Sequence, residues 1–343
     1  MSFTIRPTTA ADRPAIVSLL DAAGLTSRSR ERELDWKYFQ ERPDWSGARC
    51  FVLARDAEIF AHAGIVPSTC VWDGRRATLL HLIDWAAAPG RIGAGVTLLK
   101  HISGLADALI SVGGNENTLQ LLPAIGFRRC SIETEYVRVL HPLRYLTNSP
   151  NWGWRTLPKF ARSVLWTLAV PSRQHADWHW HRVASNQVGC LDAVLPRARA
   201  NAAVLERSSA LLAYMLKCPI ASMALHRVEQ AGKTRGYFLL AFVPGQARLV
   251  DCWVDSDKTH EWRALVQCVV QEARQDPGVA ELAAVANDAL LSDALLRAGF
   301  RARHASPILV LARKGHPLPP TFRVQMLETD AGYRHRGYAW YLA

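Results

Sequence analysis

Apolar positions along the chain recur with helical spacing in some stretches and alternate or run together in others, which predicts an ordered series of helices and strands. Polar residues at 8–12 precede the first helical stretch, as expected at a helix N-terminus. Later elements are predicted as strands at 50–55, 59–66 and 77–87, a helix at 94–106, a strand at 108–112, a helix at 117–124 and a strand at 129–140. This order predicts an α/β fold with a mixed central sheet and helices on both faces.

The second half of the chain repeats landmarks of the first half in the same order, at offsets of 173 to 177 residues. The paired landmarks are Tyr38 and Tyr214, Pro43 and Pro219, Val66 and Val243, and Gly126 and Gly299. Ordered recurrence at a nearly constant offset indicates an internal duplication. We therefore predict two tandem α/β domains, with two unrelated domains that share common dipeptides as the alternative.

The duplication divides the sequence into four parts. We predict an N-terminal domain at 1–141, a linker rich in proline and tryptophan at 142–177, a second domain at 178–315 and an aromatic tail at 316–343. Residues 155–168 of the linker have the pattern of an amphipathic helix, which either contacts a membrane surface peripherally or packs between the domains. The tail mixes polar and aromatic residues, which suit a sugar or peptide site as well as an arm packed on the core.

Composition and charge narrow the functional classes. The chain has 343 residues, of which 49% are hydrophobic and 21% charged, and its net charge is +11. A basic excess favours anionic partners, but the basic residues are scattered and lack the patterned patches of specific nucleic-acid binders. Seven cysteines without a CxxC pair argue against a metal site and for free thiols in a reducing compartment. Because the N-terminus also lacks the apolar core of a signal peptide, we expect a cytoplasmic protein.

One segment carries a recognisable binding motif, in which the strand at 77–87 leads into a glycine-rich turn and then a helix. Gly90, Gly93 and Gly95 lie in this turn. A turn without bulky side chains brings backbone N–H groups and the positive end of a helix dipole close to a diphosphate. The fingerprints of dinucleotide and nucleoside triphosphate sites, GxGxxG and GxxxxGK[ST], are absent from the segment.

The turn resembles the acyl-CoA loop of the GNAT superfamily of N-acyltransferases, whose pattern is Gln/Arg-x-x-Gly-x-Gly/Ala followed by x-x-Leu. Gly93-Ala94-Gly95 and Leu98 match this pattern, whereas Gly90 occupies the expected basic position and Arg91 follows one residue later. The resemblance implies acyl-CoA, with acetyl-CoA expected, as co-substrate. The residues that it places at the cofactor are Trp85, Ala86, Arg91, Ile92, Gly93, Ala94, Gly95, Val96 and Asn115.

Candidates for catalysis follow from the same resemblance. Many family members place a tyrosine on the last helix as a general acid, but Leu122 stands at that position here. We therefore name Asp84, on the strand beside the expected acyl site, as a candidate base and Tyr136, on the final strand, as a candidate acid. His81 and Glu116 are further candidates. Each of these side chains also has a purely structural alternative, such as a strand-end carboxylate paired with arginine.

The second copy lacks the glycine-rich turn, and residues 254–262 carry acidic side chains in its place, which repel a diphosphate. We expect this copy to act as a degenerate scaffold. The resemblance to tandem bacterial acetyltransferases linked to polysaccharide biosynthesis implies acyl transfer to a small-molecule amine, with an amino sugar as one acceptor class. The alternatives are a non-catalytic acyl-CoA-binding or scaffold protein and an aminoacyl-tRNA-dependent transferase.

Overall fold

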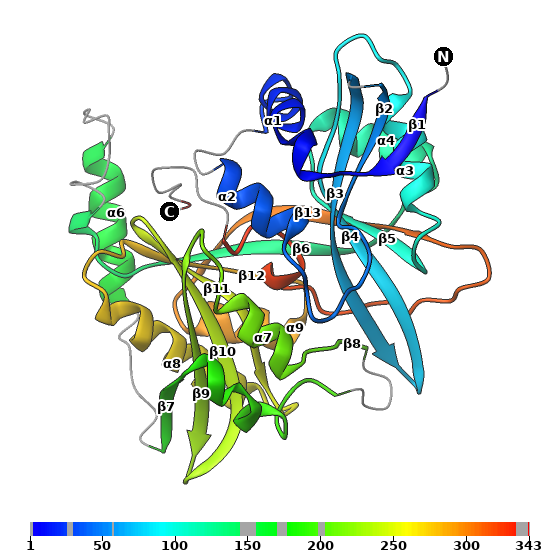
Figure 1. The fold of residues 1–343 in the computed structure, drawn as a ribbon. Helices are drawn as coiled ribbons and strands as arrows, with labels where there is room; N and C mark the ends of the chain where they lie inside the picture. The colour runs from blue at the N-terminus through cyan, green and yellow to red at the C-terminus, as the bar shows by residue number, and fades with distance from the viewer. Residues whose placement is uncertain are drawn as a thin grey trace.

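A single mixed β-sheet runs through the whole molecule and carries helices on both faces (Figure 1). The structure is a computed structural model, and it describes residues 3–25, 30–56, 58–144, 156–169, 177–197, 203–333 and 342. Within these residues the strand order is β1-β2-β3-β4-β5-β13-β6-β12-β11-β10-β9-β7, and β8 pairs with β3. The predicted mixed sheet with helices is confirmed.

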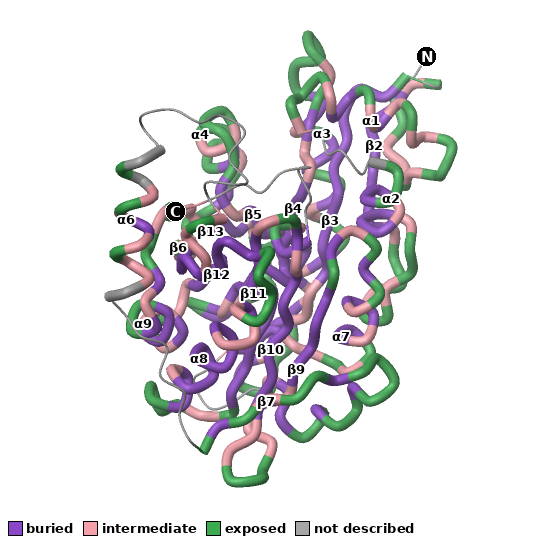
Figure 2. The backbone as a smooth tube through the Cα atoms, turned by 90° about the vertical axis from the view of Figure 1, so that its left-hand side faces the viewer, coloured by how far each residue is buried: buried purple, intermediate pink, exposed green. Residues whose placement is uncertain are grey.

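The first half of the chain supplies one end of this sheet. Its elements are β1 (Thr4–Pro7), η1 (Ala10–Asp12), α1 (Arg13–Ala22), α2 (Arg30–Leu34), η2 (Asp35–Phe39), β2 (Cys50–Arg55), β3 (Glu58–Trp72), β4 (Arg75–Ala87), α3 (Ala94–Ile102), β5 (Ala108–Val112), α4 (Glu116–Ala124) and β6 (Arg128–Val139). Alternate residues of β2 enter two different apolar clusters, one with α3 and α4 and the other with α1 and α2. The sheet is therefore buried on both faces, and most of its strands are buried along their length (Figure 2).

The second half repeats the sequence of elements. They are β7 (Trp178–Val183), η3 (Ser185–Leu191), β8 (Val204–Leu205), α7 (Ser209–Met215), β9 (Ser222–Gln230), β10 (Lys233–Val243), β11 (Gln246–Val254), α8 (Thr259–Gln275), β12 (Glu281–Ala286), α9 (Ala289–Arg297), β13 (Arg301–Ala312) and η4 (Met326–Glu328). The repeated motifs meet in space, because the ring of Trp36 stacks on Tyr214 with centroids 4.2 Å apart.

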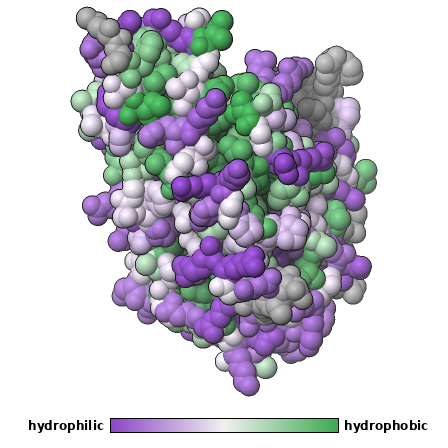
Figure 3. All heavy atoms as spheres, turned by 90° about the vertical axis from the view of Figure 1, so that its right-hand side faces the viewer, coloured by the Kyte–Doolittle hydropathy of each residue, from purple (hydrophilic) through white to green (hydrophobic). Residues whose placement is uncertain are grey.

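The linker contributes α6 (Thr156–Ala169). The guanidinium groups of Arg301 and Arg303 on β13 lie over the ring of Trp166 on this helix, at 5.8 Å and 4.8 Å from the ring centroid. The helix therefore packs against the sheet through at least this side chain. Among the helices of the described residues, none combines the length and apolar character needed to cross a bilayer. On the face shown in Figure 3, hydrophilic side chains are spread widely with smaller apolar groups between them.

The two halves exchange their last strands, which the repeat in the sequence does not predict. Strand β13 from the second half pairs with β5 of the first half, through Ile308–Ala312 and Val112–Ala108. Strand β6 from the first half pairs with β12 of the second, and β6 and β13 pair with each other. The ranges 1–141 and 178–315 thus remain a predicted division of the sequence, whereas the sheet crosses between them.

Each half contains one pair of parallel strands that separate after a short ladder. Strand β4 pairs with β5 only from Leu79 to His81, although β4 continues to Ala87. Strand β11 pairs with β12 only from Gln246 to Arg248, although β11 continues to Val254. Each separation leaves one edge of the longer strand without a neighbouring strand. In the first half, this edge of β4 is where the sequence resemblance implies the acyl site.

The strand exchange predicts that both halves unfold together. Leu98 on α3 and Leu265 on α8 are fully buried in the cores of the first and second half. We expect Leu98→Ala and Leu265→Ala each to destabilise the whole chain by about 2–5 kcal/mol, as typical of buried leucine truncations. Calorimetry should show one transition that both substitutions shift. Two transitions, each moved by the substitution in only one half, would contradict the coupling.

Candidate active site

The predicted cofactor turn lies between β4 and α3 and needs glycine at two positions. Gly90 and Gly93 have φ values of 75° and 81°, in the left-handed region that residues with a Cβ avoid. Gly93 is the N-cap residue of α3, and its carbonyl oxygen accepts hydrogen bonds from the backbone and hydroxyl of Thr97 at 2.9 Å and 3.0 Å. The N–H of Ala94 donates to the carbonyl of Arg91 at 3.2 Å, whereas the following N–H groups of the first turn have no acceptor within the helix, a geometry suited to an anion.

The neighbouring side chains shape this turn. The indole of Trp85 donates a hydrogen bond to the carbonyl of Gly95 at 3.1 Å, and a Cβ on Gly95 would lie 3.1 Å from the same nitrogen. The guanidinium of Arg91 bonds Glu58 at 2.9 Å and lies over the ring of Phe60. Arg91 is thus already paired, although an exposed ion pair of this kind holds it only weakly.

The other predicted cofactor residues have varied surroundings. Ile92 is fully exposed at the turn, whereas Ala86 and Ala94 are buried beneath it, and Val96 lies on the first turn of α3. Asn115 is the N-cap of α4, where its side-chain oxygen accepts from the backbone of Thr118 at 2.9 Å. The helix cap therefore accounts for that oxygen of Asn115 without a ligand.

Asp84 lies at a bulge in β4, in a backbone conformation with φ of 48° that is unusual for a residue other than glycine. His62 on β3 donates from Nδ1 to the carbonyl of Asp84 at 2.9 Å. With its proton on Nδ1, the neutral imidazole accepts from the thiol of Cys50, whose Sγ is 2.9 Å from Nε2. Burial lowers the pKa of His62, which favours this neutral form.

Lys37 joins Asp84 to two other segments of the chain. Its ammonium lies 2.6 Å from Asp84, 3.1 Å from Glu33 and 2.7 Å from Asp330 of the tail, and its side chain is only 3% exposed. Burial by itself lowers the pKa of Lys37, but the three carboxylates outweigh burial and hold the pKa well above its usual value. We call these four residues the Lys37 cluster.

Asp84 is held by two side chains through one of its carboxylate oxygens. The hydroxyl of Tyr38 donates to the Oδ2 of Asp84 at 2.6 Å, and Lys37 contacts the same oxygen. An oxygen that already accepts from two buried donors is poorly placed to take a proton from a substrate. The contacts of Asp84 therefore match the structural alternative, a strand carboxylate paired with a cation. The cation is Lys37 and not an arginine.

Tyr136 is not brought to the Lys37 cluster. The strand exchange places it between Ala284 on β12 and Ala302 on β13, and its ring belongs to the apolar core of the second half. Within the described part of the chain, Tyr136 has no hydrogen bond to Asp84. Glu116 lies on the exposed first turn of α4.

A buried carboxylate that the sequence analysis did not single out is Glu133 on β6. It is 7% exposed, and among the described residues its Oε1 has no hydrogen-bond partner. Burial, together with the nearby carboxylates of Glu135 and Glu328, raises the pKa of Glu133 to about 8. The available signal was the placement of Glu133 and Glu135 two residues apart, on the same strand face as Val137 and Val139.

Glu133 lies close to the separated strands of the first half. It pairs with Ser306 on β13, and the next residue, Pro307, accepts a hydrogen bond from the N–H of Gly113 at the end of β5. Two strand spacings of about 4.8 Å therefore separate Glu133 from the end of β5, or roughly 10 Å. His81, at the last β4–β5 pair, is also buried; its Nδ1 has no partner in the described structure, and burial lowers its pKa to about 4.

The second half contains a counterpart of the Lys37 cluster. Asp251 is three residues before the end of β11, as Asp84 is three before the end of β4. Arg207 contacts Asp251 at 2.9 Å and also contacts Glu328, while the hydroxyl of Tyr237 donates to Asp251 at 2.6 Å. Both halves therefore fix the strand that borders the opening with a buried cation and a tyrosine.

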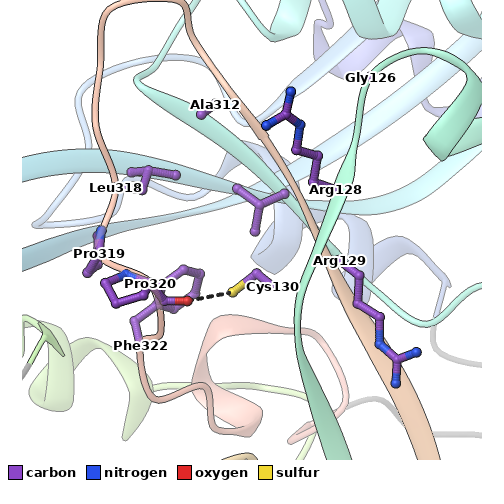
Figure 4. Close-up of a pocket in the computed structure, with 10 residues that line it drawn as sticks. Gly126, Arg128, Arg129, Cys130, Ala312, Leu318, Pro319, Pro320 and Phe322 are labelled. Atoms are coloured by element: carbon purple, nitrogen blue, oxygen red, sulfur yellow. Dashed lines mark hydrogen bonds between the residues drawn. The ribbon is translucent and has the colours of Figure 1, made fainter.

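Two cavities lie next to strands and loops of the first half and the tail. A groove of about 800 Å³, lined by Thr8 and residues 38–49, opens beside Tyr38 of the first half. A second cavity of about 610 Å³ lies between the start of β6, the end of β13 and residues 318–322 (Figure 4). There Cys130 lies against the carbonyl of Pro320, while Arg128 and Arg129 point to opposite sides of the strand. Of these two cavities, the groove is the one lined by Tyr38, whose hydroxyl donates to Asp84 of the Lys37 cluster.

Comparisons with solved structures define the class of fold. The structure is similar to Saccharomyces cerevisiae N-myristoyltransferase with bound myristoyl-CoA, with a TM-score of 0.62, 12% sequence identity, and coverage of 94% of this chain and 84% of that protein. It is also similar to a tandem GNAT protein of the clavulanic acid biosynthesis pathway (TM-score 0.56, 12% identity, 91% and 98% coverage) and to a GCN5-related N-acetyltransferase of Anabaena variabilis (TM-score 0.56, 12% identity, 90% and 72% coverage).

The chain therefore has the GNAT fold in a tandem arrangement, as the resemblance of its turn implies. No protein-family model matches the sequence, and no curated protein matches it.

The raised pKa of Glu133 makes stability depend on pH. A carboxyl whose folded pKa of about 8 lies above its unfolded value near 4.5 contributes stability only while protonated, so stability falls as pH rises between these values. We expect Glu133→Gln to remove this fall and to be the more stable protein at pH 9, measured by urea unfolding at pH 5, 7 and 9. Parallel curves for both proteins would contradict a buried, raised pKa.

Proposed function

We propose that this chain transfers an acyl group from acyl-CoA to a primary amine of a small molecule. The observation that carries the proposal is the left-handed Gly93 turn at the start of α3, directly after the strand edge that β5 leaves unpaired. Helix N–H groups suited to a diphosphate and a free strand edge suited to an extended amide chain lie in succession. That succession matches the chemistry of coenzyme A, which carries a diphosphate, an amide-containing arm and a thioester in that order.

The solved structures support an acyl-CoA donor in the same way. The yeast N-myristoyltransferase was solved with myristoyl-CoA, and the other two similar proteins are a tandem GNAT protein and a GCN5-related N-acetyltransferase. We propose acetyl as the acyl group transferred by this chain. In this arrangement the diphosphate lies at the N–H groups of Gly93, Gly95 and Val96, and the arm extends along Trp85 and Ala86 toward His81.

The acceptor side of the proposed site is acidic. Lys37 faces three carboxylates, and β6 carries the buried Glu133 and the half-buried Glu135, with Glu328 nearby. An excess of carboxylates in a buried site attracts a cationic group. We therefore propose that the acceptor arrives as a protonated amine, a class that includes amino sugars.

Glu133 is the group best suited to prepare this amine. A general base works best when its pKa is close to the working pH, and the raised pKa of Glu133 meets that condition whereas that of His81 does not. In the proposed step, Glu133 removes a proton from the ammonium directly or through water. The amine nitrogen then attacks the thioester carbonyl, the C–N bond forms and the C–S bond breaks, and the second proton that the nitrogen loses passes, directly or through water, to the coenzyme A thiolate. Asp84 positions Lys37 in this scheme, and Tyr136 has no part.

One observation favours a second candidate function, an acyl-CoA-binding protein without turnover. Leu122 stands at the position where many GNAT enzymes carry a tyrosine that acts as general acid, and it is fully buried in the core of the first half. Helix α4 therefore offers no proton donor at that position. Both functions require acyl-CoA binding, and only the enzyme releases free coenzyme A in the presence of an amine, so a thiol-detection assay with a panel of amines separates them.

The glycine turn can be tested with a matched control. Gly93 and Gly74 both have left-handed φ, at 81° and 70°, and both have open space where a Cβ would lie. Alanine therefore costs a similar strain of about 1–2 kcal/mol at either position. We expect Gly93→Ala to weaken acetyl-CoA binding at least about tenfold in calorimetric titration, a loss of about 1.4 kcal/mol, and Gly74→Ala to bind like the parent. Equal losses in both variants would move the cofactor away from the turn.

The role of Glu133 predicts a distinct pH profile. We expect kcat/KM to rise with pH up to about 8, and Glu133→Gln to lower it by about 10²–10⁴-fold and to abolish the rise that depends on this carboxyl. Glu135→Gln removes a neighbouring negative charge, so it should move the rise to lower pH while activity is kept. A Glu133→Gln variant with the parental profile would sink this assignment.

A further inference from the structure

The separated strands of the second half are bridged by the chain's own C-terminal segment. Beyond the short β11–β12 ladder, the backbone N–H of Cys252 on β11 donates to the side-chain oxygen of Gln325 at 3.0 Å. The side-chain nitrogen of Gln325 in turn donates to the carbonyl of Cys252 at 3.0 Å. One side-chain amide therefore satisfies both backbone groups of a residue that has lost its parallel neighbour.

The same segment is held from the side of β12. Asn287, directly after β12, donates to the carbonyl of Phe322 at 2.8 Å and accepts from the N–H of Val324 at 2.8 Å. Phe322 and Val324 are both buried. Residues 322–325 therefore span the opening between the two strands and make hydrogen bonds with residues on both sides of it.

Arg323 fills the part of the opening next to the helices. Its guanidinium lies 4.2 Å from the ring centroid of Trp262 and 5.0 Å from that of Trp253, and it pairs with Asp288, the N-cap of α9, at 3.0 Å. A pocket of about 420 Å³ remains beside these side chains. The segment thus takes the place that the cofactor arm occupies in our proposal for the first half.

Counting from the strand ends makes this correspondence specific. Cys252 is two residues before the end of β11, and Trp85 is two residues before the end of β4. Trp85 falls in the bulge of β4 without a partner on β3, and the ladder with β5 ends at His81. The amide of Gln325 therefore binds the second half at the position where an amide of an extended ligand would bind the first.

The segment continues directly into the first half's site. The backbone N–H of Gln325 donates to Glu328 at 2.7 Å in the capping box of η4, Glu328 contacts Arg207, and Asp330 then reaches Lys37 at 2.7 Å. Only four residues lie between Gln325 and Asp330. Because the intervening turn is itself fixed, the position of Gln325 determines where Asp330 can lie.

We propose that residues 322–325 are a built-in occupant of the second opening, and that Asn287 and Gln325 are positioning residues that hold Asp330 against Lys37. The chain accordingly binds one acyl-CoA, and its acceptor site is complete only when the tail is seated. The stoichiometry and the acceptor site rest on the proposed function, whereas the seating of the tail does not.

Hydrogen exchange tests the seating without any measurement of activity. We expect Gln325→Ala, and independently Asn287→Ala, to accelerate amide exchange throughout residues 322–333. Gln267 is a buried glutamine on α8 with no hydrogen bond to the tail in the described structure, so Gln267→Ala is the matched control and should leave that segment unchanged. Unchanged protection of residues 326–333 in both tail variants would overturn the proposal.

A double-mutant cycle then tests whether Gln325 acts through Asp330. We expect Gln325→Ala and Asp330→Asn each to raise KM for the amine and to lower kcat/KM at least tenfold, while the Kd for acetyl-CoA and its stoichiometry of one remain unchanged. The double variant should be no worse than Asp330→Asn alone, because removing Asp330 removes what Gln325 positions.

Additive losses, or two molecules of acetyl-CoA bound per parental chain, would contradict the proposed positioning or the occupied second opening. If the parental chain bound no acyl-CoA at all, the proposed function would fail. The exchange experiment would still decide whether the tail is held by Asn287 and Gln325, so the two failures remain distinguishable.

Discussion

The separation of two parallel strands in each half is the constraint on which the rest of the structure depends. It exposes backbone N–H and C=O groups of β4 and β11 inside the molecule, where polar groups without partners are costly. The second half meets this demand with the side-chain amide of Gln325. In the first half the bulge at Asp84 and the glycine turn leave the edge of β4 open next to the proposed anion site. One geometric problem, solved in two ways, thereby separates an open half, to which we assign acyl-CoA, from a filled one.

The buried ion clusters keep these strand edges in place. Removing charges from water is expensive, and a buried cation is tolerated only where carboxylates and further hydrogen bonds surround it. Lys37 meets this condition with carboxylates from α2, β4 and the tail, so it joins three segments that are remote in sequence. Arg207 joins β11 and η4 in the same manner. The left-handed Asp84 is held between Lys37 and His62, which explains how its unusual backbone conformation persists.

Local patterns in the sequence predict the part of this arrangement that is built locally. Periodicity predicts the order of helices and strands, and the glycines at 90 and 93 mark the positions in the turn where left-handed backbone is required. The exchange of β6 and β13 is invisible to such patterns, because both strands have apolar faces that fit either half. The contacts of Asp84 depend on Lys37 and Asp330, 47 residues before it and 246 after it. The pKa of Glu133 is raised first by burial and further by Glu135 and by Glu328 of the tail.

The strand exchange makes the acidic side chains on the proposed acceptor side depend on the second half of the chain. Because β6 lies in the sheet of the second half, Glu133 is carried by the first half of the chain but held in place by strands β12 and β13 of the second. The tail connects the two halves in the opposite direction. Its Gln325 binds Cys252 of the second half, and its Asp330 binds Lys37 of the first half. Loss of the second copy would therefore remove the support of the acidic side chains on the proposed acceptor side, and it would also remove β13 from its pairing with β5 of the first half. The acidic side chains at residues 254–262 would repel a diphosphate, but they do not conflict with the role that we assign to the second half. That half only has to hold the strands and the tail in position.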